Sequence, residues 1–257
     1  MGVPAESSVP SACPLAACDG SGWILGPEDV ARPCDCREGR LARARSRGIA
    51  SVIPAKYRGV SFDRPPVTQI DRRLVARLEG FCAELEANLE QGRGLWLEGD
   101  AGTGKTTLAM LVSKTALDLG SSVAIYSVPR LLSRIRRTYD AEPGEQSYLD
   151  LFDRLSAVDL LHLDDLGSEN RTDWVLEQLY ALVNERYESK RSLLVTTNLP
   201  IPELEQQVGV RTVSRLSEIC DYLQLYGRDR RVVAAVPDPG ETTLGGSGAS
   251  SLGPLDH

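Results

Sequence analysis

The sequence has no long apolar run: none of its hydrophobic stretches approaches the roughly 20 residues that a membrane-spanning helix needs. Its first residues lack the basic start and apolar core that are typical of a secretory signal. An excess of positive charge is also absent, because the 257 residues carry a net charge of −7. These absences argue against a membrane protein, a secreted protein and a strongly basic nucleic-acid binder. We therefore expect a cytoplasmic protein whose basic patches are local.

Bulky apolar side chains are scarce in the first 48 residues, which are instead rich in Gly, Pro and Cys. So small a unit can hardly build its own core and needs a staple such as a metal ion. Four cysteines gather there: Cys13, Cys18, Cys34 and Cys36. In a reducing compartment they predict one tetrahedral Zn²⁺ site rather than disulfides, with Trp23 covering it. Their spacing departs from the commoner C-x2-C, so four unligated cysteines are the alternative.

Composition divides the chain into four parts. Residues 1–48 are the cysteine module with its basic connector, and residues 49–93 are a linker with an amphipathic helix over about 71–91. Residues 94–236 alternate near-continuous apolar strands with helices, which predicts an α/β domain with a parallel sheet covered on both faces. The tail 237–257 is rich in Gly, Ser and Pro, and we expect it to be disordered.

Within the α/β part, each element follows from the pattern of apolar residues. The expected strands cover residues 94–98, 122–128, 159–165, 192–198 and 222–226, with a further short strand at 231–236. One expected helix begins at residue 107. The others cover residues 131–139, 148–155, 173–189 and 210–219.

A phosphate-binding loop is the most specific motif. It matches G-x-x-x-x-G-K-[ST] at every required position and lies between an expected strand and an expected helix. Its glycines let backbone N–H groups turn toward phosphate oxygens, and the helix N-terminus adds the positive end of a dipole. Lys105 can reach the β- and γ-phosphates, and the Thr106 hydroxyl can bind Mg²⁺. The predicted nucleotide-binding residues of this loop are Gly99, Gly102, Thr103, Gly104, Lys105, Thr106 and Thr107.

Polar residues end two later strands. Asp164 follows a run of apolar residues and is predicted to help hold Mg²⁺, while Asp165 can orient or activate the attacking water. Asn198 ends the next strand, where it can touch the γ-phosphate or that water. A pair of acids capping a turn and an Asn opening a turn before Pro200 are the simpler alternatives.

The ordered set of motifs resembles the AAA+ ATPases of the DnaC/DnaI-type replicative helicase loaders. The related IstB-type transposition helper ATPases share most of these motifs. The resemblance covers about residues 50–236 and rests on Gly99–Thr107, Leu160–Gly167, Asn184–Glu188, Thr196–Leu199 and Ser214–Leu216. It implies a P-loop NTPase fold of the AAA+ class.

The resemblance also implies a role for each matching residue. Lys105 and Thr106 are the Walker A pair, and Asp164 and Asp165 are the Walker B pair. Asn198 is sensor 1, and Arg215 is an arginine finger that acts in trans on the adjacent subunit's ATP. Arg230 is the nearest match to sensor 2, with Arg228 and Arg231 as competing candidates. Many AAA+ enzymes have Glu where this chain has Asp165, and the shorter acid implies slow hydrolysis suited to a switch. Solvated surface arginines remain the alternative for Arg215 and Arg230.

Our hypothesis is an ATP-dependent loader of a replicative DNA helicase. The zinc module would hold the helicase, and copies of the ATPase domain would assemble and bind single-stranded DNA. Arg134 and Arg137 lie on the arginine-rich helix that could meet DNA phosphates, with Tyr139 available for base stacking. A solvated helix face is the alternative for these arginines.

Three rival functions stay open. A transposition helper ATPase would bind duplex DNA and a transposase. A pure adaptor would use its ATP site only to stabilise the fold. A small-molecule kinase would share the loop, although the sequence offers no evident acceptor site.

Overall fold

The computed structural model describes residues 13, 15, 17, 18, 23–25, 31–34, 36, 53–140 and 146–227, with the backbone alone for Trp23, Leu25 and Ala31. Several predictions therefore lie outside the described residues. They concern the Trp23 side chain, the basic connector, Arg230, the strand at 231–236 and the tail 237–257. Within the described ranges no helix is long and apolar enough to cross a membrane.

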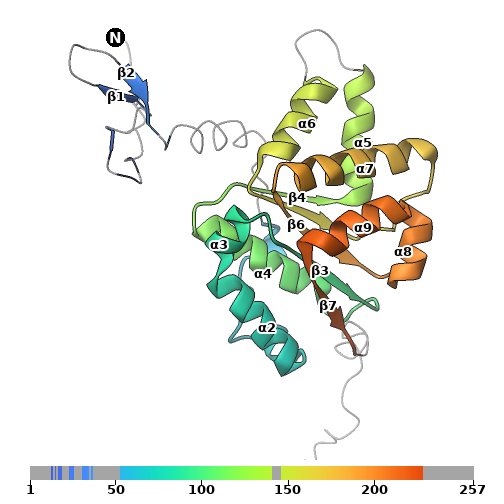
Figure 1. Ribbon diagram of the computed structural model, residues 1–257. Coiled ribbons are helices and arrows are strands. Elements are labelled where there is room, and N and C mark those ends of the chain that lie inside the picture. Colours follow the sequence, from blue (N-terminus) through green and yellow to red (C-terminus); the bar gives the residue numbers. More distant parts are fainter. Residues whose placement is uncertain are drawn as a thin grey trace, which may run out of the picture.

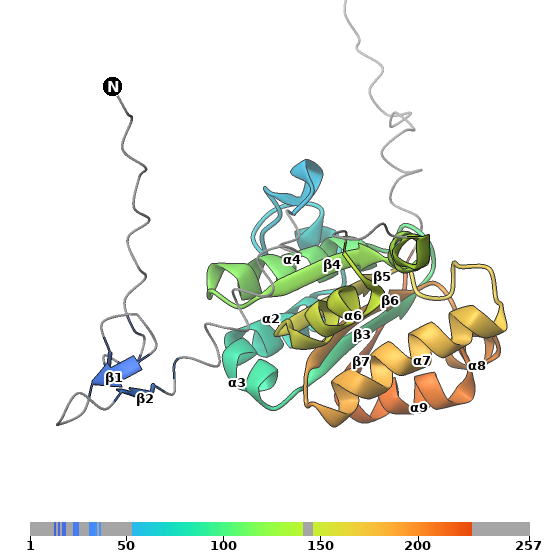
Figure 2. The same cartoon turned by 90° about the horizontal axis from the view of Figure 1, so that it is seen from above.

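Within the described residues, five parallel strands form the sheet of the larger domain, in the spatial order β4-β5-β6-β3-β7 (Figure 1; β5 is labelled in Figure 2). The strands are β3 (Gly94–Gly99), β4 (Val123–Ser127), β5 (Leu160–Asp164), β6 (Ser192–Thr197) and β7 (Cys220–Leu225). Because β6 pairs with both β3 and β5, it lies between the strand before the phosphate loop and the strand before the two acids. All strands run the same way, so their carboxyl ends meet at one edge.

Helices cover both faces of this sheet, as the sequence predicts (Figure 2). One face packs against α2 (Arg72–Ala83), α3 (Leu85–Glu90) and α4 (Lys105–Asp118). The other face packs against α5 (Val128–Arg137), α6 (Tyr148–Ala157), α7 (Asp173–Glu188), α8 (Ile201–Val208) and α9 (Val210–Ile219).

Side chains of the central strand β3 alternate between the two cores. Leu95 and Leu97 are buried with α4, whereas Trp96 is buried on the opposite face, beside α9 and β7. This is the two-sided burial that a run of apolar residues predicts for a parallel strand. The domain is therefore a three-layer α/β sandwich.

The helix expected over residues 71–91 is two helices in the structure. Asp71 caps α2, because its carboxylate accepts hydrogen bonds from the backbone N–H groups of Arg73 and Leu74. The helix then breaks at Glu84, whose φ of −105° and ψ of 20° are not helical. The buried Asn88 side chain donates to the Phe81 carbonyl at 3.1 Å, which satisfies a backbone group left open by the break. The apolar stripe continues across the break and stays buried at Leu78, Phe81, Leu85 and Leu89.

Short 3₁₀ turns complete the domain at η2 (Ala55–Tyr57), η3 (Val67–Gln69) and η4 (Thr138–Asp140). The helix expected over 131–139 begins earlier in the structure, at Val128. At Thr138 it changes from an α-helix to the 3₁₀ turn η4. Near the N-terminus, β1 (Trp23–Leu25) and β2 (Ala31–Pro33) form a separate antiparallel hairpin.

Candidate functional site

The phosphate loop connects β3 to α4 at the carboxyl edge of the sheet. Gly104 precedes the helix with φ of 106°, a left-handed conformation that a side chain disfavours, and a Cβ there would lie 2.8 Å from Ile70 Cδ1. The loop is closed by Thr103, whose hydroxyl donates to the Asp100 carbonyl at 2.8 Å. The first N–H groups of α4 therefore face the space enclosed by the loop.

The Lys105 ammonium group lies against the loop itself. Its Nζ donates to the carbonyl oxygens of Gly99 at 2.7 Å and Asp100 at 2.8 Å. The side chain is buried, with 6% of its surface exposed, so its charge sits close to the loop and is shielded from bulk water. This places a cation beside the N-terminus of α4, which suits an anionic ligand.

The Asp164 carboxylate is the meeting point of three elements. Its Oδ1 accepts hydrogen bonds from Thr106 Oγ1 of α4 at 3.0 Å and from Thr196 Oγ1 of β6 at 2.7 Å. Burial disfavours the charged form, but these bonds and the neighbouring His162 outweigh it, and the pKa of the carboxyl lies below its usual range. His162 is itself fully buried and meets Ser113 Oγ of α4 at 3.0 Å.

Asp165 and Asn198 lie side by side at the carboxyl edge of the sheet. Asn198 Nδ2 donates to Asp165 Oδ1 at 2.9 Å. The backbone N–H of Asp165 donates to Thr196 Oγ1 at 2.8 Å, so one hydroxyl contacts both acidic residues. Asp165 has φ of 66°, a left-handed value at which Asp and Asn are among the better tolerated side-chain residues.

A cavity of about 610 Å³ opens beside the loop. It brings together most of the residues predicted to bind nucleotide. The lining residues are Lys56, Tyr57, Pro66, Ile70, Ala101, Gly102, Gly104, Lys105, Thr106, Thr107, Asp164, Asp165 and Asn198. Sequence reasoning missed the first four, which come from the segment before α2. Nothing in their pattern marks them, because only the fold brings that segment against the loop.

Arg215 does not line this cavity. It projects from α9, where its guanidinium carbon lies 4.2 Å from the centroid of the Tyr187 ring on α7. Its Nη1 also lies 3.4 Å from Glu218 Oε1. Arg215 is thus separate from the cavity beside the loop of its own chain.

A second hollow of about 610 Å³ follows the arginine-rich helix α5. Its lining residues are Tyr126, Arg130, Ser133, Arg134, Arg137, Thr138 and Gln146. Arg134 is oriented within it by two hydrogen bonds, to Tyr126 Oη at 3.0 Å and to Gln146 Oε1 at 2.9 Å.

Aromatic rings gather near the C-terminal end of α5, outside the lining of this hollow. Tyr139 is 53% exposed and stacks on Tyr148, with 5.7 Å between centroids. Trp174 packs edge-on against Tyr139 at 6.2 Å, and the Arg136 guanidinium lies over its ring at 4.8 Å. The sequence singled out Tyr139 alone, because Tyr148 and Trp174 are distant in the chain.

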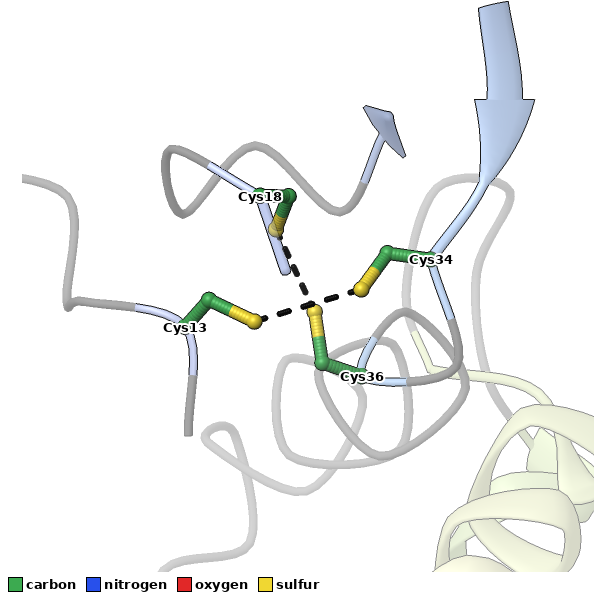
Figure 3. Close-up of side chains that lie close together, drawn as sticks. All are labelled: Cys13, Cys18, Cys34 and Cys36. Carbon is green, nitrogen blue, oxygen red and sulfur yellow. Dashed lines mark hydrogen bonds between the residues drawn. The ribbon is translucent and has the colours of Figure 1, made fainter. Parts of the chain in front are cut away.

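The four N-terminal cysteines converge, and Figure 3 shows their sulfur atoms pointing toward one another. All four Sγ atoms lie within 4.8 Å of each other, with Cys13 to Cys34 at 3.9 Å and Cys18 to Cys36 at 3.6 Å. These distances are too long for disulfide bonds. They match the separation of about 3.8 Å between thiolates that bind one tetrahedral Zn²⁺ with Zn–S bonds of about 2.3 Å.

The pKa values of the Cys13 and Cys36 thiols shift in opposite directions. Desolvation raises the pKa of Cys13, but hydrogen bonds from the backbone of Ala17, Cys18 and Leu15 outweigh this and lower the pKa to about 6. Desolvation and the neighbouring sulfurs instead raise the pKa of Cys36 to about 12. Crowded thiols oppose one another's ionisation, and a bound cation would remove that opposition.

The parallel sheet, the loop at the edge of β3 and the paired acids at the end of β5 define a P-loop ATPase fold of the AAA+ class. The family model described as IstB-like ATP binding protein matches residues 36–228, and the chain belongs to that family.

Replicative helicase loaders are similar to the chain over much of the same region. The chain is 28% identical over 166 residues to the replicative helicase loader DnaC of Buchnera aphidicola subsp. Acyrthosiphon pisum (strain APS), covering 65% of this chain and 66% of that protein. It is 25% identical over 181 residues to the replicative helicase loader DnaC of Escherichia coli (strain K12), covering 70% of this chain and 72% of that protein. A crystal structure of the DnaC helicase loader superposes with a TM-score of 0.58 at 26% identity, covering 67% of this chain and 99% of that chain.

Proposed function

We propose that this protein is an ATP-dependent loader that delivers a replicative DNA helicase to single-stranded DNA and uses ATP hydrolysis as the release switch. Family membership and the similarity to DnaC replicative helicase loaders support the loader role. The single observation that carries the ATPase part is the network in which Thr196 contacts both Asp164 and Asp165 beside the phosphate loop.

The loop residues would bind the ATP phosphates through backbone N–H groups, with Lys105 supplying the positive charge. Thr106 Oγ1 and Asp164 Oδ1 lie 3.0 Å apart, which fits adjacent oxygens in an octahedral Mg²⁺ site with bonds of about 2.1 Å. Mg²⁺ bound there would neutralise charge on the β- and γ-phosphates. The base would lie toward Tyr57 and Ile70, which give the cavity apolar surface.

Asp165 and Asn198 would hold the attacking water. Their side chains are joined by a 2.9 Å hydrogen bond, so the carboxylate is fixed in one orientation and can accept a proton from water. The short reach of Asp165 supports slow turnover. Arg215 would complete the ATP site of an adjacent copy. Arg230, which is not among the described residues, would act as sensor 2.

Single-stranded DNA would bind along α5. Arg134 and Arg137 line one hollow of that helix and offer guanidinium groups to phosphates. Tyr139, Tyr148 and Trp174 offer ring faces and edges near the same helix, which suits unpaired bases.

The cysteine cluster would hold one structural Zn²⁺, and the module that it stabilises would grip the helicase. Zn²⁺ supplies four strong bonds that replace a hydrophobic core in a unit of this size. Metal analysis of the protein should give one zinc per chain, and the Cys34→Ser variant should give none. Protein purified without chelators that contains no zinc would refute this part of the proposal.

A transposition helper ATPase is the second candidate, favoured by the match to the IstB-like family over residues 36–228. The two functions differ in partner, so a pull-down with tagged full-length protein decides between them. A replicative helicase and a transposase from the same source are offered together in the presence of ATP. Capture of the helicase supports the loader, whereas capture of the transposase alone overturns it.

A further inference from the structure

Three side chains on α7 and α9 form a closed set of contacts. The Arg215 guanidinium lies over the Tyr187 ring, 4.2 Å from its centroid. The Tyr187 hydroxyl donates to Glu218 Oε2 at 2.6 Å, and the other oxygen of Glu218 lies 3.4 Å from Arg215 Nη1. Each residue thus contacts both of the others. The closed set restricts where the guanidinium can point.

The backbone that carries these side chains is rigid. Leu179, Leu182 and Val183 of α7 are buried in one core with Val213 and Leu216 of α9, all at 2% exposure or less. The rotation of each helix is therefore fixed. The backbone positions of Tyr187 on α7 and Arg215 on α9 are therefore fixed relative to each other.

The contacts hold the guanidinium without neutralising it. The Arg215 and Glu218 side chains are 33% and 46% exposed, so water screens their ion pair and its strength is small. The 2.6 Å bond ties Glu218 more closely to Tyr187 than to Arg215. Within the described residues, Arg215 Nη1 donates to Glu218 Oε1 at 3.4 Å, and the side chain also contacts Tyr187. Most of its five N–H donors thus remain for a phosphate.

We propose that Tyr187 is the positioning residue of Arg215: its ring holds the guanidinium in the orientation that meets a phosphate on an adjacent copy, and Glu218 braces the ring through its hydroxyl. This inference rests on the proposed trans action of Arg215. A cation over an aromatic face keeps its charge and its donors, which a close ion pair would occupy. Tyr187 belongs to the segment Asn184–Glu188, to which the sequence assigns no role of its own.

The first test separates the ring from the hydroxyl. In Tyr187→Leu the cation loses its aromatic partner, and we expect kcat for ATP to fall about tenfold, with KM within about twofold. Tyr187→Phe keeps the ring and should stay within about threefold of wild-type kcat. Glu218→Ala removes the acceptor of the Tyr187 hydroxyl, and its kcat should lie between those of Tyr187→Phe and Tyr187→Leu. Turnover is measured with a dT oligonucleotide present, and thermal melting checks folding. Equal kcat in Tyr187→Leu and wild type overturns the proposal, as does an equal loss in Tyr187→Phe and Tyr187→Leu.

The second test asks whether Tyr187 acts across subunits. Lys105→Ala subunits lack a working loop but carry intact Tyr187 and Arg215. Mixed with Tyr187→Leu subunits, they should restore turnover at the sites of the latter, which a purely structural defect would not allow. Absence of recovery overturns the positioning role. Arg215→Ala in the same assay tests the proposed function: normal turnover there refutes the arginine finger itself. Loss in Arg215→Ala with none in Tyr187→Leu refutes only the role of Tyr187.

Discussion

At the scale of single residues, the Thr196 hydroxyl connects Asp164 and Asp165 through hydrogen bonds. This buried hydroxyl donates to Asp164 and accepts from the backbone N–H of Asp165. It lies on β6, the strand between the loop strand and the acid strand. A shift of β6 would therefore disturb both acids together.

Lys105 carries the first prediction. Lys105→Ala removes the ammonium that lies against the loop carbonyls, so the cavity would lose its buried cation beside the N-terminus of α4. We expect ATP affinity to fall at least a hundredfold, or about 2.7 kcal/mol, measured by titration with a fluorescent ATP analogue. Lys114→Ala on the same helix is the control and should bind normally, because Lys114 lies outside the cavity. Equal affinity in the two variants would contradict the assignment of the loop.

At the scale of elements, Arg186 connects three segments of chain. It is fully buried in α7, and its guanidinium donates to the carbonyls of Leu155 at 2.7 Å and Ser192 at 2.6 Å. Longer bonds of 3.3 Å reach Ser156 and Asp159. One side chain thereby ties the end of α6 and the starts of β5 and β6 to α7.

Truncation of this side chain should destabilise the domain strongly. In Arg186→Ala, several buried carbonyls lose their donor and a cavity remains, so we expect the free energy of unfolding to fall by about 3–5 kcal/mol in urea denaturation. Arg186→Lys should recover only part of that loss, since a single ammonium lacks the planar fork of donors. The exposed Arg77→Ala is the control and should change stability by less than about 0.5 kcal/mol. A small loss in Arg186→Ala would contradict the role of the carbonyl contacts.

Helix α6 supplies a prediction about pH. Ser147 and Asp150 form a capping box, and hydrogen bonds from the Ser147 side chain and backbone lower the pKa of the Asp150 carboxyl. A carboxyl with a lowered folded-state pKa stabilises the fold above its unfolded pKa and loses that effect as pH falls through the folded value. Amides at the start of α6 should therefore exchange faster as the pH drops below about 4, after correction for intrinsic exchange.

The matched variant for this prediction is Asp150→Asn, which cannot titrate. Hydrogen exchange of residues 148–157 should then lose most of its extra pH dependence between pH 5 and pH 3. If the variant and the wild type respond to acid alike, the capping box does not control the stability of α6.

At the scale of the whole molecule, a chain with a net charge of −7 should bind single-stranded DNA only through local positive charge. Each phosphate contact that is lost should reduce the slope of log affinity against log salt by about 0.7. We expect that reduction in Arg134→Ala and in Arg137→Ala, measured by fluorescence anisotropy with a dT oligonucleotide from about 50 to 200 mM salt. Arg77→Ala on α2 is the control, and an equal effect there would contradict binding along α5.

Much of this architecture follows from local patterns in the chain. The apolar runs predict the strands because both faces of a parallel sheet are buried, and the motif from Gly99 to Thr106 predicts the loop because its geometry is local. The break at Glu84 is not predictable in this way, since the apolar stripe passes through it unchanged. The contact of Tyr57 with the cavity and the contact of Arg215 with Tyr187 depend on packing between distant segments.

The left-handed backbone of Asp165 has a consequence for how this site can vary. At φ of 66° short polar side chains are favoured over long ones, so the turn itself restricts the choice of acid. A change to Glu at this position would place a longer side chain on a left-handed backbone, at the turn from which Asp165 accepts the hydrogen bond of Asn198. The identity of the acid and the shape of the chain at this turn are therefore linked, so a substitution at position 165 should be judged by its effect on the backbone as well as on the side chain.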